Sequence, residues 1–208
     1  MSCAQGLTRH ACAVAAAVVA AVAAAPHAYA HPHSWIDLNS TVVLTGEGKI
    51  TAVRARWAFD EYYTADLMRQ TGGVQVFADT ALTNLRPYGY FTHLNDAGGR
   101  ADFASPSGVA ARLEGKRLVL EFTLPLARPV GPNAELRVFD PTYYIDMAHR
   151  GENAVTVEGA GAARCRTRIV EAQPSEETRR RAFEMDRQAV PDHGLGEQFA
   201  QTVILQCG

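Results

Sequence analysis

The sequence lacks the signatures of several common enzyme classes. It contains no G-x-S-x-G motif, no H-E-x-x-H motif and no glycine-rich loop of the kind that holds a phosphate. It has no C-x-x-C pair, which argues against dithiol redox chemistry. Its formal net charge of −2 provides no strong field for nucleic acid or for an anionic membrane surface. We therefore expect no enzyme activity and no nucleic-acid partner.

The chain also lacks an apolar run long enough to span a membrane. Residues 11–25 are mostly alanine and valine, whereas a spanning helix needs about 20 apolar residues. A short basic start precedes this run, and residues 28–30 (AYA) come after it as an A-x-A cleavage signal. We expect residues 1–30 to be a signal peptide and residues 31–208 to be a single periplasmic domain with no membrane anchor.

Cysteine is scarce after the expected cleavage site. Of the four cysteines, Cys3 and Cys12 lie in the leader, so only Cys165 and Cys207 remain. An even pair in an oxidising compartment predicts one disulfide bond. This bond would tie the last predicted strand to a strand about forty residues earlier.

Alternating apolar residues predict strands along most of the chain. Residues 34–44 and 50–59 alternate on either side of a turn and predict a hairpin, and residues 108–126 predict another. Further strands are expected at residues 134–149 (interrupted at Asp140-Pro141), 154–158 and 163–171, and at the C-terminal end.

Helical spacing is confined to a few segments. Residues 61–71 predict a helix that ends at Gly72, Asp79 is expected to cap a second helix, and residues 175–188 predict a charged third helix. The fold expected from these patterns is mainly β (α+β), an antiparallel β-sandwich-like domain with two or three peripheral helices.

Two histidines lie next to the expected cleavage site. Cleavage after Ala30 would make His31 the first residue, so its amino group and its imidazole could chelate one metal ion, with His33 as a second imidazole. Pro32 has no N–H, which rules out the square-planar copper or nickel motif that needs the second amide nitrogen. A metal site with ligands from elsewhere in the fold and a solvated chain terminus both remain open.

Other polar residues have a structural and a functional interpretation. Asp60 could cap the following helix or turn its carboxylate towards a metal. His93 lies in an aromatic stretch, either packed there or as a third imidazole, and Asp140 precedes a proline and fits a turn. Asp146 lies on an alternating strand, and His149 is interpreted as a loop end.

Six ordered segments resemble a family of bacterial periplasmic proteins. They are AHPHSWID, RWAFDEYY, YGYFTHL, FTLPLARPV, LRVFDPTYYID and LGEQFAQTVILQC. They come in the order seen in the family, and the resemblance covers essentially all of the chain after the leader. Many members are labelled as the periplasmic component of an uncharacterised ABC-type transport system, and the family includes the ZevA-like zinc-binding proteins. The resemblance implies metal handling in the periplasm.

The resemblance and the residues together give a set of candidate ligands. These are His31, His33, Asp60 and His93, with Asp37, Glu61, Asp140, Tyr144 and Asp146 as residues that would orient the ligands or support the fold.

The expected function is that of a periplasmic protein that binds Zn2+ and buffers it or delivers it to an inner-membrane metal permease. Imidazole and oxygen ligands favour zinc, with Cu2+, Ni2+ and Co2+ as alternatives, and the scattered methionines do not indicate copper(I). Two other functions stay open. One is a metal-free carrier or interaction domain with an aromatic surface, and the other is a copper or zinc enzyme that uses the N-terminal histidine.

Overall fold

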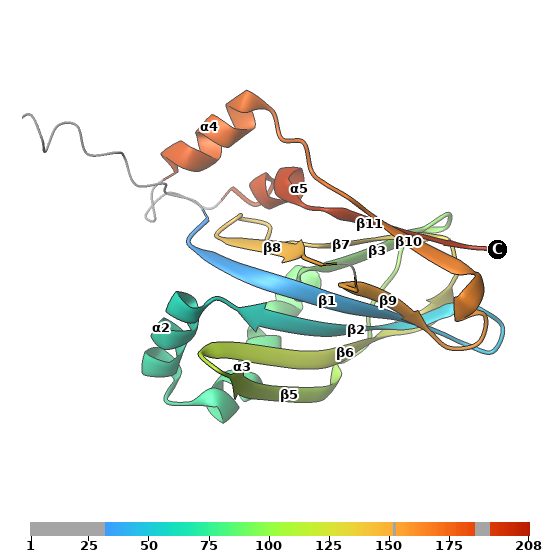
Figure 1. Cartoon of the computed structure of the whole chain (residues 1–208), viewed down its shortest axis with the longest axis horizontal. Helices are drawn as coiled ribbons and strands as arrows, with labels where there is room; N and C mark the ends of the chain where they lie inside the picture. Colours follow the sequence, from blue (N-terminus) through green and yellow to red (C-terminus); the bar gives the residue numbers. More distant parts are fainter. Residues whose placement is uncertain (1–31, 152, 186–191) are drawn as a thin grey trace, which may run out of the picture.

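The protein is a sandwich of two β-sheets, as the sequence predicts. The computed structural model describes residues 32–151, 153–185 and 192–208 (Figure 1). Sheet A contains, in spatial order, β5 (Ser107–Glu114), β6 (Arg117–Val130), β2 (Ile50–Phe59), β1 (Ser34–Leu44) and β8 (Ile145–His149), and β9 (Val155–Glu158) also pairs with β1. Sheet B contains β10 (Cys165–Val170), β11 (Thr202–Cys207), β7 (Ala134–Val138), β3 (Thr92–Asp96) and β4 (Gly99–Arg100).

Strand β1 lies inside sheet A and pairs on both sides. It runs antiparallel to β2, with Leu38 opposite Trp57, and parallel to β8 and then to β9 on its other side. Its side chains alternate between buried and half-buried or exposed along the whole strand. The alternation seen in the sequence therefore separates a core face from a solvent face.

The core lies between the two sheets. Both sheets contribute fully buried aliphatic residues, and Trp57 and Phe122 meet edge to face with ring centroids 5.1 Å apart. The largest side chains with almost no exposure are Ile36, Leu38, Ile50, Leu94, Leu118, Leu120, Leu124, Leu136 and Leu195.

The described residues include four α-helices, one more than the upper end of our expectation. They are α2 (Glu61–Thr71), α3 (Val74–Leu85), α4 (Glu176–Glu184) and α5 (Leu195–Phe199), and the 3-10 turns are η1 (Arg86–Phe91) and η2 (Ala162–Arg164). In Figure 1, α2, α4 and α5 gather at the end where β1 begins, and the C terminus lies at the opposite end.

The predicted helix over residues 61–71 is confirmed, but our prediction of where the next helix starts was wrong. Gly72 ends α2 with a φ of 74°, a conformation that glycine adopts at little cost. Helix α3 then begins at Val74, so Asp79 lies inside it and does not cap it. The third predicted helix, over residues 175–188, corresponds to α4, which starts after Ser175 as expected and ends at Glu184. Residues 186–188 of this prediction lie outside the described residues.

The segment 134–149 forms two strands, as expected, but they belong to different sheets. Strand β7 lies in sheet B and β8 lies in sheet A, so the loop that contains Asp140 crosses between the layers. Alternation along a strand records which face is buried, and it carries no information about which sheet the strand joins.

A chain of polar side chains connects the two sheets at one side of the core. The hydroxyl of Ser40 and Nε2 of His149 are 2.8 Å apart, and the amide oxygen of Gln201 accepts from the backbone N–H of His149 at 2.7 Å. The Gln201 amide nitrogen donates to the Glu171 carboxylate. His149 is 5% exposed and ends β8, so our interpretation of it as a loop residue was wrong.

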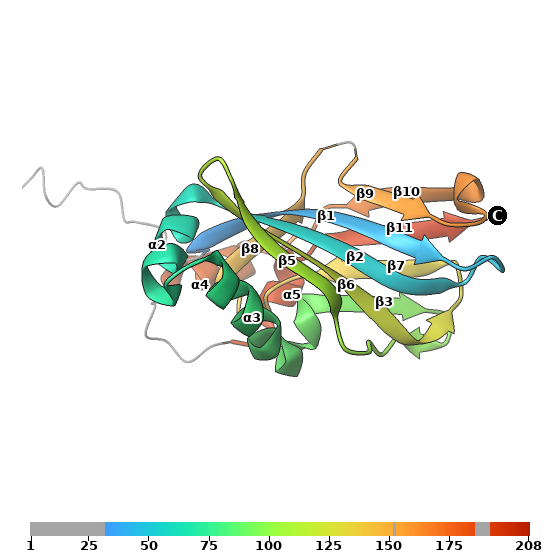
Figure 2. The same cartoon turned by 90° about the horizontal axis from the view of Figure 1, so that it is seen from below.

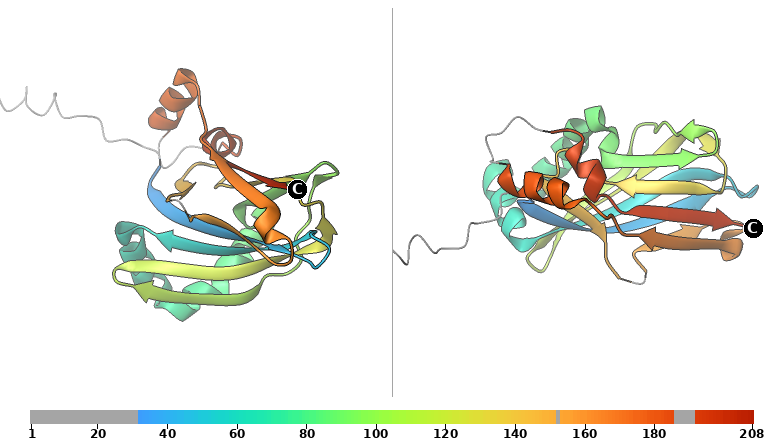
Figure 3. Two further views of the ribbon diagram at one scale, coloured as in Figure 1. Left: turned by 45° about the vertical axis from the view of Figure 1, so that its right-hand side comes forward. Right: turned by 90° about the horizontal axis from the view of Figure 1, so that it is seen from above.

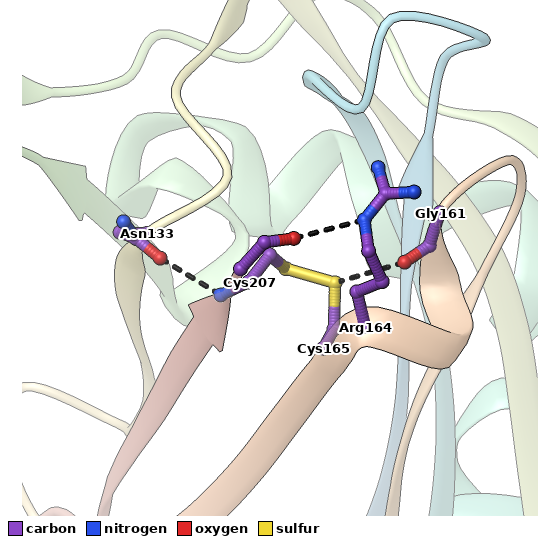
Figure 4. The surroundings of a disulfide bond; sticks show 6 residues. Asn133, Gly161, Arg164, Cys165 and Cys207 are labelled. Carbon is purple, nitrogen blue, oxygen red and sulfur yellow. Dashed lines mark hydrogen bonds between the residues drawn. A yellow bond between two sulfur atoms is a disulfide. The ribbon is translucent and has the colours of Figure 1, made fainter.

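The predicted disulfide bond is confirmed. Cys165 and Cys207 lie directly opposite each other in the β10–β11 pair, with a separation of 42 residues in sequence. Figure 4 shows how the end of β11 is held there. Asn133 accepts a hydrogen bond from the N–H of Cys207, and Arg164 donates to the carbonyl of Gly208.

Within the described ranges, no helix is both long and apolar enough to cross a membrane.

Loss of the disulfide bond should lower the stability substantially. In the chain-entropy description, closing a loop of this length contributes about 4 kcal/mol, so Cys165→Ser/Cys207→Ser should unfold at clearly lower urea concentration. Urea unfolding of the double variant beside the oxidised protein measures the effect. An unchanged midpoint would contradict the prediction.

Burial of His149 should make the protein less stable in mild acid. Burial lowers the pKa of His149 to about 4, so the unfolded chain binds the proton at a higher pH than the native protein does. Stability from this residue is therefore present above its ordinary pKa and falls by about 2 kcal/mol between pH 7 and pH 5. Urea unfolding at both pH values should show a smaller loss for His149→Gln, and an equal loss would count against this role.

Candidate metal-binding end

Four of the candidate residues, His33, Asp60, Asp140 and Tyr144, lie at the end of the sandwich where β1 and β8 begin. His31 lies outside the described residues, so this end is defined by the residues from His33 onward. Figure 3 shows α2 on one side of the start of β1, with α4 and α5 on the other side. We refer to His33, Ser34, Asp60, Tyr63, Asp140 and Tyr144 as the His33 end.

His33 is held in place by Tyr144, the residue directly before β8. Its backbone N–H donates to the carbonyl of Tyr144 at 2.9 Å, and the two rings are tilted by 47° with centroids 4.7 Å apart. The parallel pairing of β1 with β8 continues from this point, with Ser34 opposite Ile145. His33 is therefore an ordered residue of the folded domain and not part of a solvated chain terminus.

Asp60 caps helix α2, as one of its two interpretations expected. One carboxylate oxygen accepts from the N–H of Tyr63 at 2.8 Å, and the other accepts from the Ser34 hydroxyl at 2.8 Å and the Trp35 N–H at 2.9 Å. Burial alone would raise the pKa of Asp60, but these hydrogen bonds outweigh it and hold the pKa below its ordinary value. The same carboxylate thus joins the helix to the start of β1.

Asp140 organises the loop between the two sheets. It is 5% exposed, and its carboxylate accepts from the N–H and hydroxyl of Thr142 and from the N–H of Ile145 at 3.1 Å. This is the turn expected from the Asp-Pro pair. Tyr143 comes next in this loop with a φ of 57°, a costly conformation for a tyrosine, and its ring stacks on Phe199 of α5 at 3.8 Å.

Helix α5 packs directly on this loop. The N–H of Gly196 donates to the carbonyl of Pro141 at 2.9 Å. A Cβ atom on Gly196 would lie 1.8 Å from the carbonyl oxygen of Asp140, so only glycine permits this approach.

The two carboxylates of the His33 end have no cationic partner among the described residues. Asp60 and Asp140 accept only from neutral N–H and O–H groups, and neither takes part in an ion pair in those ranges. Burial raises the pKa of the Tyr63 phenol, and the charges of Asp140 and Asp60 are among those that raise it further. The His33 end therefore holds two carboxylates that form no ion pair within the described ranges.

Three of the expected supporting residues lie outside this group. Asp37 binds Arg117 and Arg150 on the outer face of sheet A, and although burial acts to raise its pKa, these arginines lower it. Burial raises the pKa of Asp146 although it binds Arg150. Glu61 is exposed in the first turn of α2 and forms an ion pair with Lys116 at 3.8 Å.

His93 lies on the outer face of sheet B and stacks on Phe139, with ring centroids 4.5 Å apart. Burial and the nearby charges of Arg100 and Arg137 lower its pKa to about 4. Its Nε2 is buried and has no hydrogen-bond partner among the described residues. No group of three or more His, Cys, Asp or Glu residues in those ranges could hold a metal, so His33, Asp60 and His93 do not assemble there.

Sequence reasoning did not single out Ser34 or Tyr63. Ser34 meets Asp60 across 26 positions, so no local motif marks it, whereas the N–H of Tyr63 belongs to the helix cap at Asp60. Exposed aromatic side chains surround the same end: Trp35 is 45% exposed, Tyr62 is 89% exposed and Tyr144 is 36% exposed.

Residues 16–207 match a family described as a protein of unknown function, DUF1007. The chain belongs to this family. The match spans both sheets and every residue of the His33 end. The family description contains neither a transport label nor a zinc-binding label.

An uncharacterised protein of Haemophilus influenzae is 30% identical over 190 residues, covering 86% of this chain and 91% of the relative. No solved structure matches the chain.

Substitution of Gly196 should displace the loop that carries Asp140 and so destabilise the His33 end. The added methyl group of Gly196→Ala would meet the Asp140 carbonyl, so we expect a loss of about 3 kcal/mol in unfolding free energy. The matched control is Gly194→Ala, whose Cβ would lie 3.6 Å from the nearest atom, an Asp192 oxygen, and should cost about 0.5 kcal/mol or less. Urea unfolding compares them, and equal effects would refute the close packing of α5.

Proposed function

We propose that the protein is a periplasmic metal-binding protein of the DUF1007 family that takes up a divalent transition metal, zinc first, at the His33 end. It buffers this metal or passes it to an inner-membrane permease. The observation that supports this proposal most is the pair of carboxylates, Asp60 and Asp140, that flank the His33 segment and accept hydrogen bonds only from neutral donors among the described residues.

The donor chemistry of the His33 end fits a cation of this kind. His33 offers an imidazole, a ligand that zinc, copper and nickel share. Asp60 and Asp140 already accept several hydrogen bonds each, so their contribution is negative charge at short range and not direct coordination. In this proposal the remaining protein ligands are the imidazole of His31 and the amino group that cleavage after Ala30 would create.

Rigid support of the imidazole lowers the cost of binding. The backbone N–H of His33 donates to the carbonyl of Tyr144, the imidazole lies against the Tyr144 ring, and the Ser34 hydroxyl donates to Asp60. A ligand that is already ordered loses little conformational entropy when a metal arrives, so more of the interaction energy appears as affinity.

The exposed aromatic residues support delivery to a partner. Trp35, Tyr62 and Tyr144 lie around the proposed metal site. Tryptophan and tyrosine are enriched where protein surfaces meet, so a permease could contact the protein at the end that carries the metal. A metal-free carrier domain would use the same aromatic surface and is the alternative function.

Calorimetry with Zn2+ tests the proposal. The metal-free chain starting at His31 should bind one zinc ion, and one extra alanine before His31 should weaken binding if the amino group is a ligand. His33→Ala should abolish tight binding, and Asp140→Asn should weaken it about tenfold or more through the lost charge.

The matched control is His193→Ala, an exposed histidine outside the His33 end, which should bind zinc like the wild type. Equal binding with and without the extra alanine would show that the metal is bound by side chains alone, without the amino group. No binding to any variant, or equal loss in the control, would refute the proposed function and favour the metal-free alternative.

A further inference from the structure

A cleft open to solvent lies where helix α4 meets the loop that Asp140 organises. Its volume is about 440 Å³, and side chains of α4 line it together with Tyr143 of the loop and Phe199 of α5. The Thr178 hydroxyl donates to the side-chain oxygen of Gln198 at 2.8 Å, which fixes α4 to α5. In Figure 2, both helices lie behind sheet A, on the side of sheet B.

The residues that α4 contributes to the cleft follow the spacing of one helix face. Arg179, Arg180 and Phe183 come three, four and seven positions after Glu176, and residues at these spacings lie on the same side of an α-helix. Ala182 lies beside them and is 3% exposed. Helix α4 therefore directs two cationic side chains and one aromatic side chain to the same cleft.

The two arginines of the cleft have no acidic partner in the described part of the chain. Neither Arg179 nor Arg180 forms an ion pair there. The Nε atom of Arg179 donates to the carbonyl of Pro174 at 3.1 Å, which orients the guanidinium group. Glu176 is the one acid among the described residues that line the cleft, so the cationic side chains there outnumber the acidic ones.

The aromatic side chains of the cleft are held by a strained loop. Tyr143 has a φ of 57°, a conformation that few residues other than glycine adopt, and its ring stacks on Phe199 with the planes 10° from parallel. The N–H of Tyr143 donates to the carbonyl of Asp140 at 3.0 Å. Strained residues of this kind persist only where the surrounding structure fixes them, and they are frequent at ligand-binding sites. These contacts give the cleft an ordered aromatic surface.

We propose that this cleft binds a small organic carboxylate with an apolar or aromatic body. Arg179 and Arg180 bind the carboxylate, because a planar guanidinium group matches its two oxygen atoms and forms strong charge-assisted hydrogen bonds. The body of the ligand packs against the rings of Tyr143, Phe183 and Phe199. The volume of about 440 Å³ lies in the range of small-molecule sites.

The cleft is distinct from the metal site proposed above. Tyr143 comes directly before Tyr144 in the chain, so the two sites share a loop, but none of the residues that line the cleft belongs to the His33 end. Binding of a carboxylate here requires no metal. Experiments with EDTA present therefore test the cleft whether or not the His33 end binds zinc.

Three probes separate the charge of the ligand from its apolar body. The chain from His31 onward should bind phenylpropionate in the presence of EDTA, and an NMR titration gives the dissociation constant. Acetate has the charge without the body, and phenylpropionamide has the body without the charge, so each should bind about tenfold more weakly or less. No binding of phenylpropionate, or equal affinity for it and either of the other probes, would overturn the proposal.

Arginine variants locate the binding. Arg179→Gln/Arg180→Gln should weaken phenylpropionate binding about tenfold or more without unfolding the protein, because both side chains are exposed. The matched control is Arg166→Gln/Arg168→Gln, which removes two exposed arginines of β10 that also form no ion pair among the described residues. The control should bind like the wild type. Unchanged binding in the first variant, or equal weakening in both, would overturn the proposed site.

Discussion

The position of β1 inside sheet A is the constraint on which the His33 end depends. β1 pairs with β2 on one side and with β8 and β9 on the other, so it joins the first hairpin to strands from the last third of the chain. Asp60 and Asp140 hold the two sides of this junction, one at the end of β2 and one before β8. The backbone of His33 is fixed because both partners of β1 are fixed.

The carboxylates of the His33 end are bound differently from those on the outer face of sheet A. On the outer face of sheet A, acidic residues bind arginines, as in the contacts of Asp37 with Arg117 and of Glu121 with Arg112. Asp60 and Asp140 instead accept from backbone and hydroxyl groups. The hydrogen bonds to Asp60 hold its pKa below the ordinary value, so this carboxylate keeps its charge without an ion pair in the described part of the molecule.

Local patterns predicted the elements of the fold better than their assembly. The hairpins and the helix from Glu61 to Thr71 could be predicted from alternation, turn residues and caps, which act over a few positions. Pairing of β8 with β1 and the burial of His149 depend on contacts across more than a hundred residues, as the Ser40–His149 hydrogen bond illustrates. Such contacts leave no periodic signal, so sequence reasoning found His33 and Asp60 but could not place His33 beside Tyr144 or Asp60 beside Ser34.

The pairing of β1 with β8 and β9 also sets the order in which the chain can fold. During synthesis from the N terminus, β1, β2, β5 and β6 can form hairpins early, since each pair is close in sequence. The other side of β1 stays open until residues 145–158 are available, and the strand pair that carries Cys165 and Cys207 closes only when the last residues arrive. Such a high contact order predicts slow folding, with one flank of the central strand exposed to chaperones for most of that time.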